Sequence, residues 1–279
     1  MQTSMMQVIW HDGWIVISKH MVKFLLCLTI FLSYSSCKYK LSTYSANTPK
    51  QKLNAVNLAR IEIQEATETP NFKIALIADT HNYYEELDDM IDTINSRGPF
   101  SFVIVAGDIT NLGLLEEYDN SRRFLNKLKY PYLVAVGNHD LLANGDPIYK
   151  KMFGHRDFAF SYKGVQFIIF DNNNWENSGT VPDTAWVEAR LFESNASERI
   201  LIAHVPPNDR DRFTDDQIKR WQELVDLHNI HYFFTGHNHT PEESTFGRAT
   251  HITIGAPSKG SYFELMIGPG GIQHQKVDI

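Results

Sequence analysis

Five short apolar runs in this chain are each followed at once by aspartate, histidine or asparagine. Continuous apolar runs of this length suit buried strands of a sheet covered on both faces. The carboxyl ends of such strands are where α/β sheets build their functional sites. The five runs and their polar successors are Ile74–Ala78 with Asp79 and His81, Phe102–Ala106 with Asp108, Tyr132–Val136 with Asn138, His139 and Asp140, Ile200–Ala203 with His204, and Tyr232–Thr235 with His237 and His239.

Helix-period segments lie between these runs, which indicates an α/β domain over residues 71–279. The hairpin expected across Lys163-Gly164, within Phe158–Phe170, makes part of the sheet antiparallel. With 43% hydrophobic residues, the chain can form one substantial core. The expected helices are Tyr84–Ser96, Leu115–Leu128, Asp183–Phe192 and Thr214–His228, the last two with Asp183 and Thr214 as N-caps.

The N-terminal part has the order of a secretory signal. A basic start at Lys23 precedes the apolar run Phe24–Leu32, and small residues lead to Cys37. We interpret residues 21–37 as a lipoprotein-type signal peptide, although Tyr34 stands where leucine is usual. A plain signal peptide, an uncleaved anchor and an incidental apolar stretch remain as alternatives. The run is far shorter than the roughly 20 residues that a spanning helix needs.

This interpretation predicts export to a bacterial cell envelope, with a lipid anchor at Cys37 holding the protein on the membrane. Residues 1–20 add nothing to a signal, so we interpret them as a gene-start extension, with translation beginning at Met21. Residues 38–70 are polar and are expected to be a tether, with one short strand around Ala59–Ile63.

Composition excludes several classes of site. With only Cys27 and Cys37, neither a disulfide scaffold nor a cysteine-rich zinc site can form. The 26 basic and 33 acidic residues give a net charge of −7, so no nucleic-acid binding through bulk charge is expected.

The spacing of the polar residues suits a metal centre. Residues i and i+2 of an extended chain point the same way, so Asp79 with His81, and His237 with His239, can each face one point. Imidazole, carboxylate and amide ligands without thiolate suit Mn, Fe or Zn. A single D-x-H tripeptide is more often structural, so the order of all the motifs carries the prediction. If Asp108 bridges, two divalent ions receive four protein ligands each.

The ordered series D-x-H, G-D, G-N-H-D, H and G-H-x-H resembles the calcineurin-like metallophosphoesterase family, with some similarity to the branch of class III cyclic-nucleotide phosphodiesterases. The resemblance implies a four-layer α/β/β/α sandwich of two mixed β-sheets flanked by helices. It also implies two metal sites that share Asp108. The first comprises Asp79, His81, Asp108 and His239, and the second comprises Asp108, Asn138, His204 and His237.

The expected reaction is hydrolysis of a phosphate mono- or diester by a metal-bridging hydroxide. His139 follows a ligand directly and is the candidate for stabilising the transition state or protonating the leaving oxygen. Asn111 stands where many family members have aspartate, and we expect its side-chain amide to orient His139. The alternative is that Asn111 only caps the loop after Asp108. Asp140 is expected to support the site without being a ligand.

A different class of function is a catalytically silent, surface-anchored binding protein on the same scaffold. Such proteins usually lose ligands, whereas all seven residues are present here. The expected substrate is a small-molecule or envelope phosphoester, and the oligomeric state stays open. The remaining aromatic and imidazole groups are expected to pack or to lie at the surface: Trp175, Trp186, Trp221, His155, His228, His231, His251 and His274.

Overall fold

The computed structural model describes residues 6–10, 13–17, 23–24, 42, 44–65 and 70–279. The chain divides into two units, Met1–Ser42 and Thr43–Ile279. In the first, β1 (Met6–Trp10) pairs antiparallel with β2 (Gly13–Ile17). Cys37 and nearly all of the apolar run of the predicted signal lie outside the described residues. Among the helices that are described, none is both long and apolar enough to cross a membrane.

Two mixed sheets form the second unit. The five-stranded sheet has the order β13-β12-β3-β4-β5, in which β3, β4 and β5 are parallel. The six-stranded sheet has the order β10-β11-β9-β8-β7-β6, in which β7, β8 and β9 are parallel. The strands are β3 (Phe72–Ile77), β4 (Phe102–Val105), β5 (Tyr132–Val134), β6 (Phe158–Tyr162), β7 (Val165–Ile169), β8 (Glu198–Ile202), β9 (Tyr232–Thr235), β10 (Glu242–Phe246), β11 (Ala249–Thr253), β12 (Ser261–Gly268) and β13 (Gly271–Asp278).

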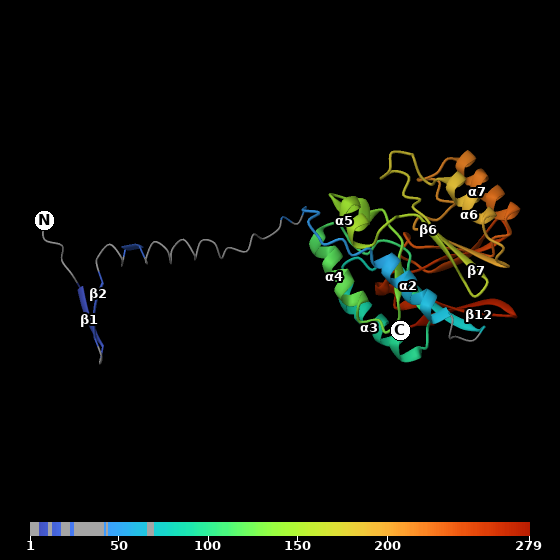
Figure 1. The fold of residues 1–279 in the computed structure, drawn as a ribbon. Coiled ribbons are helices and arrows are strands. Elements are labelled where there is room, and N and C mark those ends of the chain that lie inside the picture. The colour runs from blue at the N-terminus through green and yellow to red at the C-terminus, as the bar shows by residue number, and fades with distance from the viewer. Residues whose placement is uncertain (1–5, 11–12, 18–22, 25–41, 43, 66–69) are drawn as a thin grey trace. The chain divides into compact units, whose positions relative to one another are not determined.

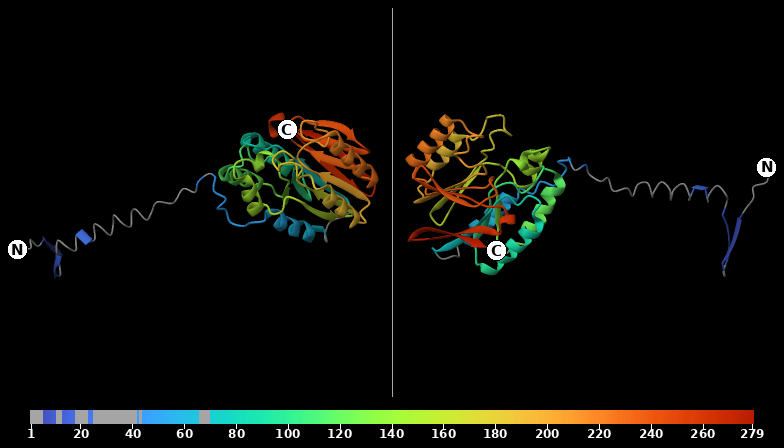
Figure 2. Two further views of the ribbon diagram at one scale, coloured as in Figure 1. Left: turned by 90° about the horizontal axis from the view of Figure 1, so that it is seen from above. Right: turned by 180° about the vertical axis from the view of Figure 1, so that it is seen from behind.

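The sheets pack face to face, and helices cover their outer faces (Figures 1 and 2). Alternate residues of each strand point to opposite faces. Leu76 of β3 therefore joins the core between the sheets, whereas Ile77 joins the core beneath α3 and α4. A third core lies between the six-stranded sheet and helices α6 and α7. The predicted α/β/β/α sandwich of two mixed sheets is confirmed.

All four predicted helices form, and Asp183 and Thr214 each accept a bond from a backbone N–H at the N-terminus of their helix. The sequence analysis missed α5, which contains glycine and proline in its first turn. Two 3-10 turns, η1 (His139–Leu141) and η2 (Pro257–Lys259), complete the unit. The helices after β3 are α3 (Tyr84–Arg97), α4 (Leu115–Leu125), α5 (Gly145–Met152), α6 (Thr184–Phe192) and α7 (Asp215–Leu227).

The strand predicted around Ala59–Ile63 is wrong, because these residues belong to helix α2 (Leu53–Glu65). This part of the predicted tether packs on the domain. The buried Asn54 donates to the carbonyl of Val134 and accepts from its N–H, both at 2.9 Å, and Asn57 donates to the carbonyl of Tyr132 at 2.7 Å. The helix thus satisfies backbone groups along the edge strand β5, which would otherwise be exposed to unwanted pairing. The polar composition of residues 38–70 gave no sign that α2 would pack on β5.

This packing predicts that Asn54→Ala lowers the free energy of unfolding by about 1–3 kcal/mol, because two buried backbone groups of Val134 lose their partners. Urea denaturation measures the change. Glu62→Ala, at an exposed position of the same helix, should change stability by less than about 0.5 kcal/mol. Equal stability of the Asn54 variant and the wild type would contradict the packing of α2 on β5.

Candidate metal centre

The strands that precede the predicted ligands end at one place. Parallel β3, β4 and β5 deliver Asp79, Asp108 and Asn138 from one sheet, and parallel β8 and β9 deliver His204 and His237 from the other. Backbone bonds tie the loops after the strands together: Asp79 N–H donates to the carbonyl of Gly107 at 3.1 Å. The site therefore lies where the carboxyl edges of the two sheets meet.

All seven predicted ligands converge there. One group comprises Asp79, His81, Asp108 and His239, and a second comprises Asp108, His204 and His237. Within each group the candidate ligand atoms lie within 4.8 Å of one another. Asn138 Oδ1 completes the second group, at 3.1 Å from His204 Nε2 and 2.9 Å from His237 Nδ1. The structure thus brings together the two sets that the sequence motifs predicted, with Asp108 common to both.

The backbone reaches this arrangement at a cost. Five candidate ligands adopt left-handed backbone angles, which are rare for residues other than glycine and cluster at functional sites. They are Asp79 (φ 52°), His81 (φ 37°), Asp108 (φ 53°), His237 (φ 74°) and His239 (φ 58°).

Two glycines make room for the ligand side chains. A Cβ at Gly107 would lie 2.5 Å from Nδ1 of His204, and one at Gly236 would lie 2.6 Å from Oδ2 of Asp79. Gly107 also has a φ of +88°. Glycine at these positions therefore permits close approach as well as the turn that the sequence suggested.

Hydrogen bonds fix the imidazoles for metal binding. The Nδ1–H of His81 donates to the carbonyl of Thr110 at 2.9 Å, and the Nδ1–H of His204 donates to that of Ala106 at 2.8 Å. In the neutral rings Nε2 then carries a bare lone pair aimed at the cluster, as ligating histidines require. His81 Nε2 lies 3.0 Å from Nε2 of His239, so the two nitrogens are close enough to bind one ion.

The charges of the site also fit a cation. Asp108 Oδ2 is buried without a hydrogen bond, although His204 Nε2 lies 3.1 Å away. Burial lowers the pKa of His204, but the Asp108 and Asp79 carboxylates and the carbonyl of Ala106 together outweigh it and bring the pKa to about 10. Burial raises the pKa of Asp79 to about 8, and burial lowers the pKa of His81 to about 4. Without ions the cluster retains protons between its ligand atoms, which divalent cations would displace.

His139 lies beside this cluster, with its ring centroid 4.8 Å from that of His81. The backbone N–H of His139 donates to Oδ1 of Asp108 at 2.8 Å. The predicted side-chain contact with Asn111 is wrong: His139 Nδ1 lies 2.6 Å from the backbone carbonyl of Asn111, whose side chain is at an exposed position. The side-chain amide of Asn111 therefore does not orient the imidazole ring of His139. The sequence motif correctly placed Asn111 beside His139, but it could not show that the backbone carbonyl of Asn111, and not its side chain, contacts the ring.

Asp140 supports the loops without joining either group, as predicted. Its Oδ1 accepts from the N–H and hydroxyl of Thr110 at 3.0 and 2.9 Å, and its Oδ2 accepts from the N–H of Gly137 at 2.9 Å. These bonds hold the loop that carries Asp108 against the loop that carries Asn138.

Sequence reasoning missed two supporting residues. Asn172 follows β7 and accepts from the N–H groups of His204 and Val205, at 3.2 and 3.0 Å. Asp209 has Oδ2 at 3.8 Å from His237 Nε2, the nitrogen that faces away from Asn138. The position of Asn172 just after an apolar run is the same signal that identified the ligands. Asp209 follows no strand directly and carried no such signal.

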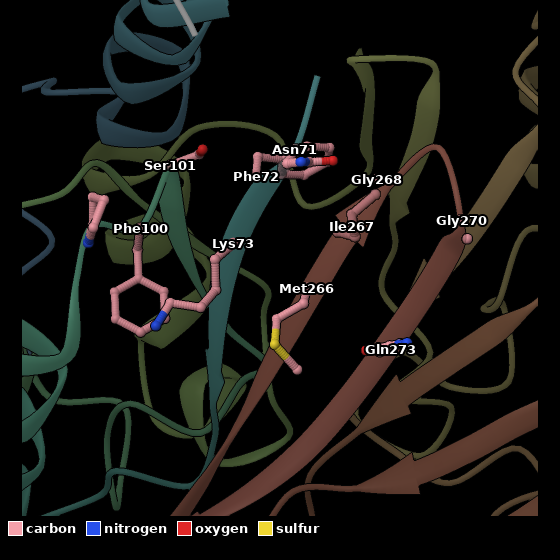
Figure 3. Close-up of a pocket in the computed structure, with 12 residues that line it drawn as sticks. Asn71, Phe72, Lys73, Phe100, Ser101, Met266, Ile267, Gly268, Gly270 and Gln273 are labelled. Atoms are coloured by element: carbon pink, nitrogen blue, oxygen red, sulfur yellow. The ribbon is translucent and has the colours of Figure 1, made fainter. Parts of the chain in front are cut away.

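A cavity of about 740 Å³ lies elsewhere. It is lined by the start of β3, the end of β12, the start of β13 and the residues before β4, including Lys73, Met266 and Phe100 (Figure 3). Lys73 precedes Asp79 by six residues along β3, a separation of about 20 Å at ~3.3 Å per residue. The cavity is therefore at the opposite edge of the sheet from the metal centre.

Comparison with known proteins gives the same family as the motifs. Residues 72–241 match the model of the calcineurin-like phosphoesterase family. A glycerophosphodiester phosphodiesterase of Enterobacter lignolyticus is 28% identical over 188 residues, which are 60% of this chain and 66% of that protein. A probable cyclic nucleotide phosphodiesterase of Xenorhabdus bovienii is 27% identical over 214 residues, which are 68% of this chain and 79% of that protein. The matched region thus spans about two thirds of the first relative.

Solved structures share the fold at low sequence identity. A dimetal phosphatase from Danio rerio superimposes with a TM-score of 0.57 at 15% identity, covering 74% of this chain and 98% of that one. Purple acid phosphatase from yellow lupin gives a TM-score of 0.58 at 11% identity, covering 76% of this chain and 52% of that one. The family model covers more than half of the chain, and the seven convergent side chains all lie within the matched residues 72–241. The chain therefore belongs to the calcineurin-like phosphoesterase family.

Proposed function

We propose that the protein is a dinuclear, metal-dependent phosphoesterase that hydrolyses small phosphodiesters. The observation that carries this proposal is the convergence of seven nitrogen and oxygen ligands in two groups that share Asp108. Asp79, His81, Asp108 and His239 would hold one divalent ion, and Asp108, Asn138, His204 and His237 the other. The donor set suits Mn, Fe or Zn.

When bound, two such ions supply Lewis-acid activation of a water and of a phosphoryl oxygen. The chain's own contribution beyond the ligands is His139. Because its Nδ1–H donates to the carbonyl of Asn111, Nε2 is the nitrogen left to face a substrate. There it would donate a proton to the leaving oxygen or stabilise the developing charge, a contribution of typically ~10²–10⁴-fold.

A phosphodiester substrate is favoured by the two relatives, which are named for glycerophosphodiesters and for cyclic nucleotides. Two observations disfavour a catalytically silent binding protein. The ligand set is complete, and hydrogen bonds to backbone carbonyls fix the tautomers of His81 and His204, which a binding scaffold would not require. We further propose export to a bacterial cell envelope with a lipid anchor at Cys37, supported by the order of Lys23, Phe24–Leu32 and Cys37.

Loss of the shared ligand tests the metal assignment. Asp108→Asn and Asn138→Ala should each lower kcat by at least about 10³-fold and reduce bound metal, because several kcal/mol of transition-state stabilisation depend on the ions. Metal content by mass spectrometry and turnover of an aryl phosphodiester measure both effects, and circular dichroism verifies folding. Asp119→Asn, on the surface of α4, is the matched control. Wild-type turnover and metal content in the Asp108 variant would overturn the assignment.

Because His139 Nδ1 contacts the backbone carbonyl of Asn111, substitutions at His139 and at Asn111 should have different effects on activity. His139→Ala should lower kcat by about 10²–10⁴-fold. Asn111→Ala and Asn111→Asp should stay within about threefold of the wild type, with an unchanged pH–rate profile, since the carbonyl that accepts from Nδ1 belongs to the main chain. A loss of more than tenfold in Asn111→Ala, with its fold intact, would restore a side-chain role for Asn111.

Expression of the full chain in a bacterium tests the location. The protein should fractionate with membranes and carry lipid on Cys37, and Cys37→Ser should release it or stall its processing. Cys27→Ser is the matched control and should leave fractionation unchanged. Mass spectrometry that finds an unmodified N-terminus in the cytosolic fraction would contradict the anchor.

A further inference from the structure

Trp175 was expected to be a packing residue, but its side chain is 60% exposed. It lies in the segment that follows β7, and β7 runs parallel to β8, the strand that ends before His204. Topology therefore places the tryptophan at the same edge of the six-stranded sheet as the metal centre. An exposed indole at this edge is unusual enough to need an explanation, because tryptophan generally buries most of its surface.

The segment that carries Trp175 is firmly held. Asp171 Oδ2 accepts from Arg156 at 2.6 Å and from the side chain of Asn177 at 3.1 Å, and Asn177 Nδ2 donates to the carbonyl of Asn173 at 2.9 Å. Asn173 in turn donates to the carbonyl of Val136, just before the loop of Asn138. The backbone on both sides of Trp175 is thus held by these bonds, and Asn173 ties it to the end of the chain segment that leads to Asn138.

One face of the indole is already covered. The guanidinium carbon of Arg212 lies 4.3 Å from the ring centroid, a cation–π contact. Glu176 holds the guanidinium with two bonds, at 2.9 and 3.0 Å, and both charged side chains are largely buried. Arginine held in this way keeps the ring at one orientation and leaves its other face for a partner.

The stack also connects to the metal centre through Asp209. The backbone N–H of Arg212 donates to Asp209 Oδ1 at 3.2 Å, and Oδ2 of the same carboxylate lies 3.8 Å from Nε2 of the candidate ligand His237. Arg212 and His237 therefore flank one carboxylate. The segment that supplies the cation of the stack is therefore anchored beside the second metal group.

We propose that Trp175, supported by Arg212 and Glu176, is a stacking surface for the nucleobase of a phosphodiester substrate. The inference rests on the proposed function, since it assigns the non-reacting part of the substrate at that same site. Stacking on an exposed aromatic ring is sequence-tolerant and strong for any base. A glycerol group has no aromatic face to stack on the ring and, unlike choline, no cation to bind it. Trp175 would thus determine specificity between the two kinds of diester for which the relatives are named.

The test compares kcat/KM of the Mn²⁺-loaded full chain for 3′,5′-cyclic AMP and for glycerophosphoglycerol, followed by phosphorus NMR. Trp175→Ala should lower the value for cyclic AMP by about 5- to 150-fold, the range expected for one lost stacking contact. The value for glycerophosphoglycerol should change by less than about twofold. Trp175→Phe should retain most of the activity on cyclic AMP. The matched control is Trp186→Ala, since Trp186 also has an arginine beside its ring, Arg190 at 5.7 Å, but belongs to α6.

A second measurement does not depend on turnover. AMP titrated into the Mn²⁺-loaded chain should quench tryptophan fluorescence in the wild type and in Trp186→Phe, but not in Trp175→Phe. Equal losses for both diesters in Trp175→Ala, no loss for either, or hydrolysis by the wild type of glycerophosphoglycerol alone would overturn the stacking surface and leave the phosphoesterase intact. If the wild type hydrolyses neither diester with Mn, Fe or Zn, the proposed function fails, and the AMP titration still decides whether Trp175 binds a base.

Discussion

The carboxylate of Asp108 is buried between imidazoles of two different sheets, and much of the site follows from how that charge is balanced. His204 Nε2 lies 3.1 Å and His81 Nε2 lies 3.6 Å from Asp108 Oδ2. A buried carboxylate is costly unless it is paired or binds a metal. The burial of the carboxylate and the imidazole nitrogens that face it together favour a cation in this position, and they explain why so many polar side chains occupy an otherwise apolar junction.

The fold provides that junction through its topology. Parallel strands end at the same edge, so each sheet delivers several ligands to one line, and packing the two sheets face to face brings the two lines together. The supporting residues then fix the loops: Asp140 joins the loops after β4 and β5, and Asn172 holds the backbone of His204. Left-handed backbone angles at Asp79 and His237 show that the ligand geometry overrides local preference.

Sequence reasoning predicted the parts of the molecule that depend on local pattern. Buried strands read as apolar runs, and the first ligand lies one or two residues after the end of each run, so the α/β class and the convergent site could be predicted. The sandwich of two sheets was implied by the family resemblance. Helix α2 could not, because Asn54 and Asn57 look like tether residues until the edge of β5 is known. The acceptor for His139 was likewise hidden, since composition does not distinguish a backbone carbonyl from an amide side chain. Trp175 was misjudged because most tryptophans pack.

The central claim is that the seven residues hold two ions that share Asp108. Anomalous diffraction from crystals of the chain grown with Mn²⁺ measures this directly. The account predicts two peaks about 3.5–4 Å apart, one among Asp79, His81 and His239 and the other among Asn138, His204 and His237, with Asp108 between them. A single peak, or manganese bound only away from these residues, would contradict it.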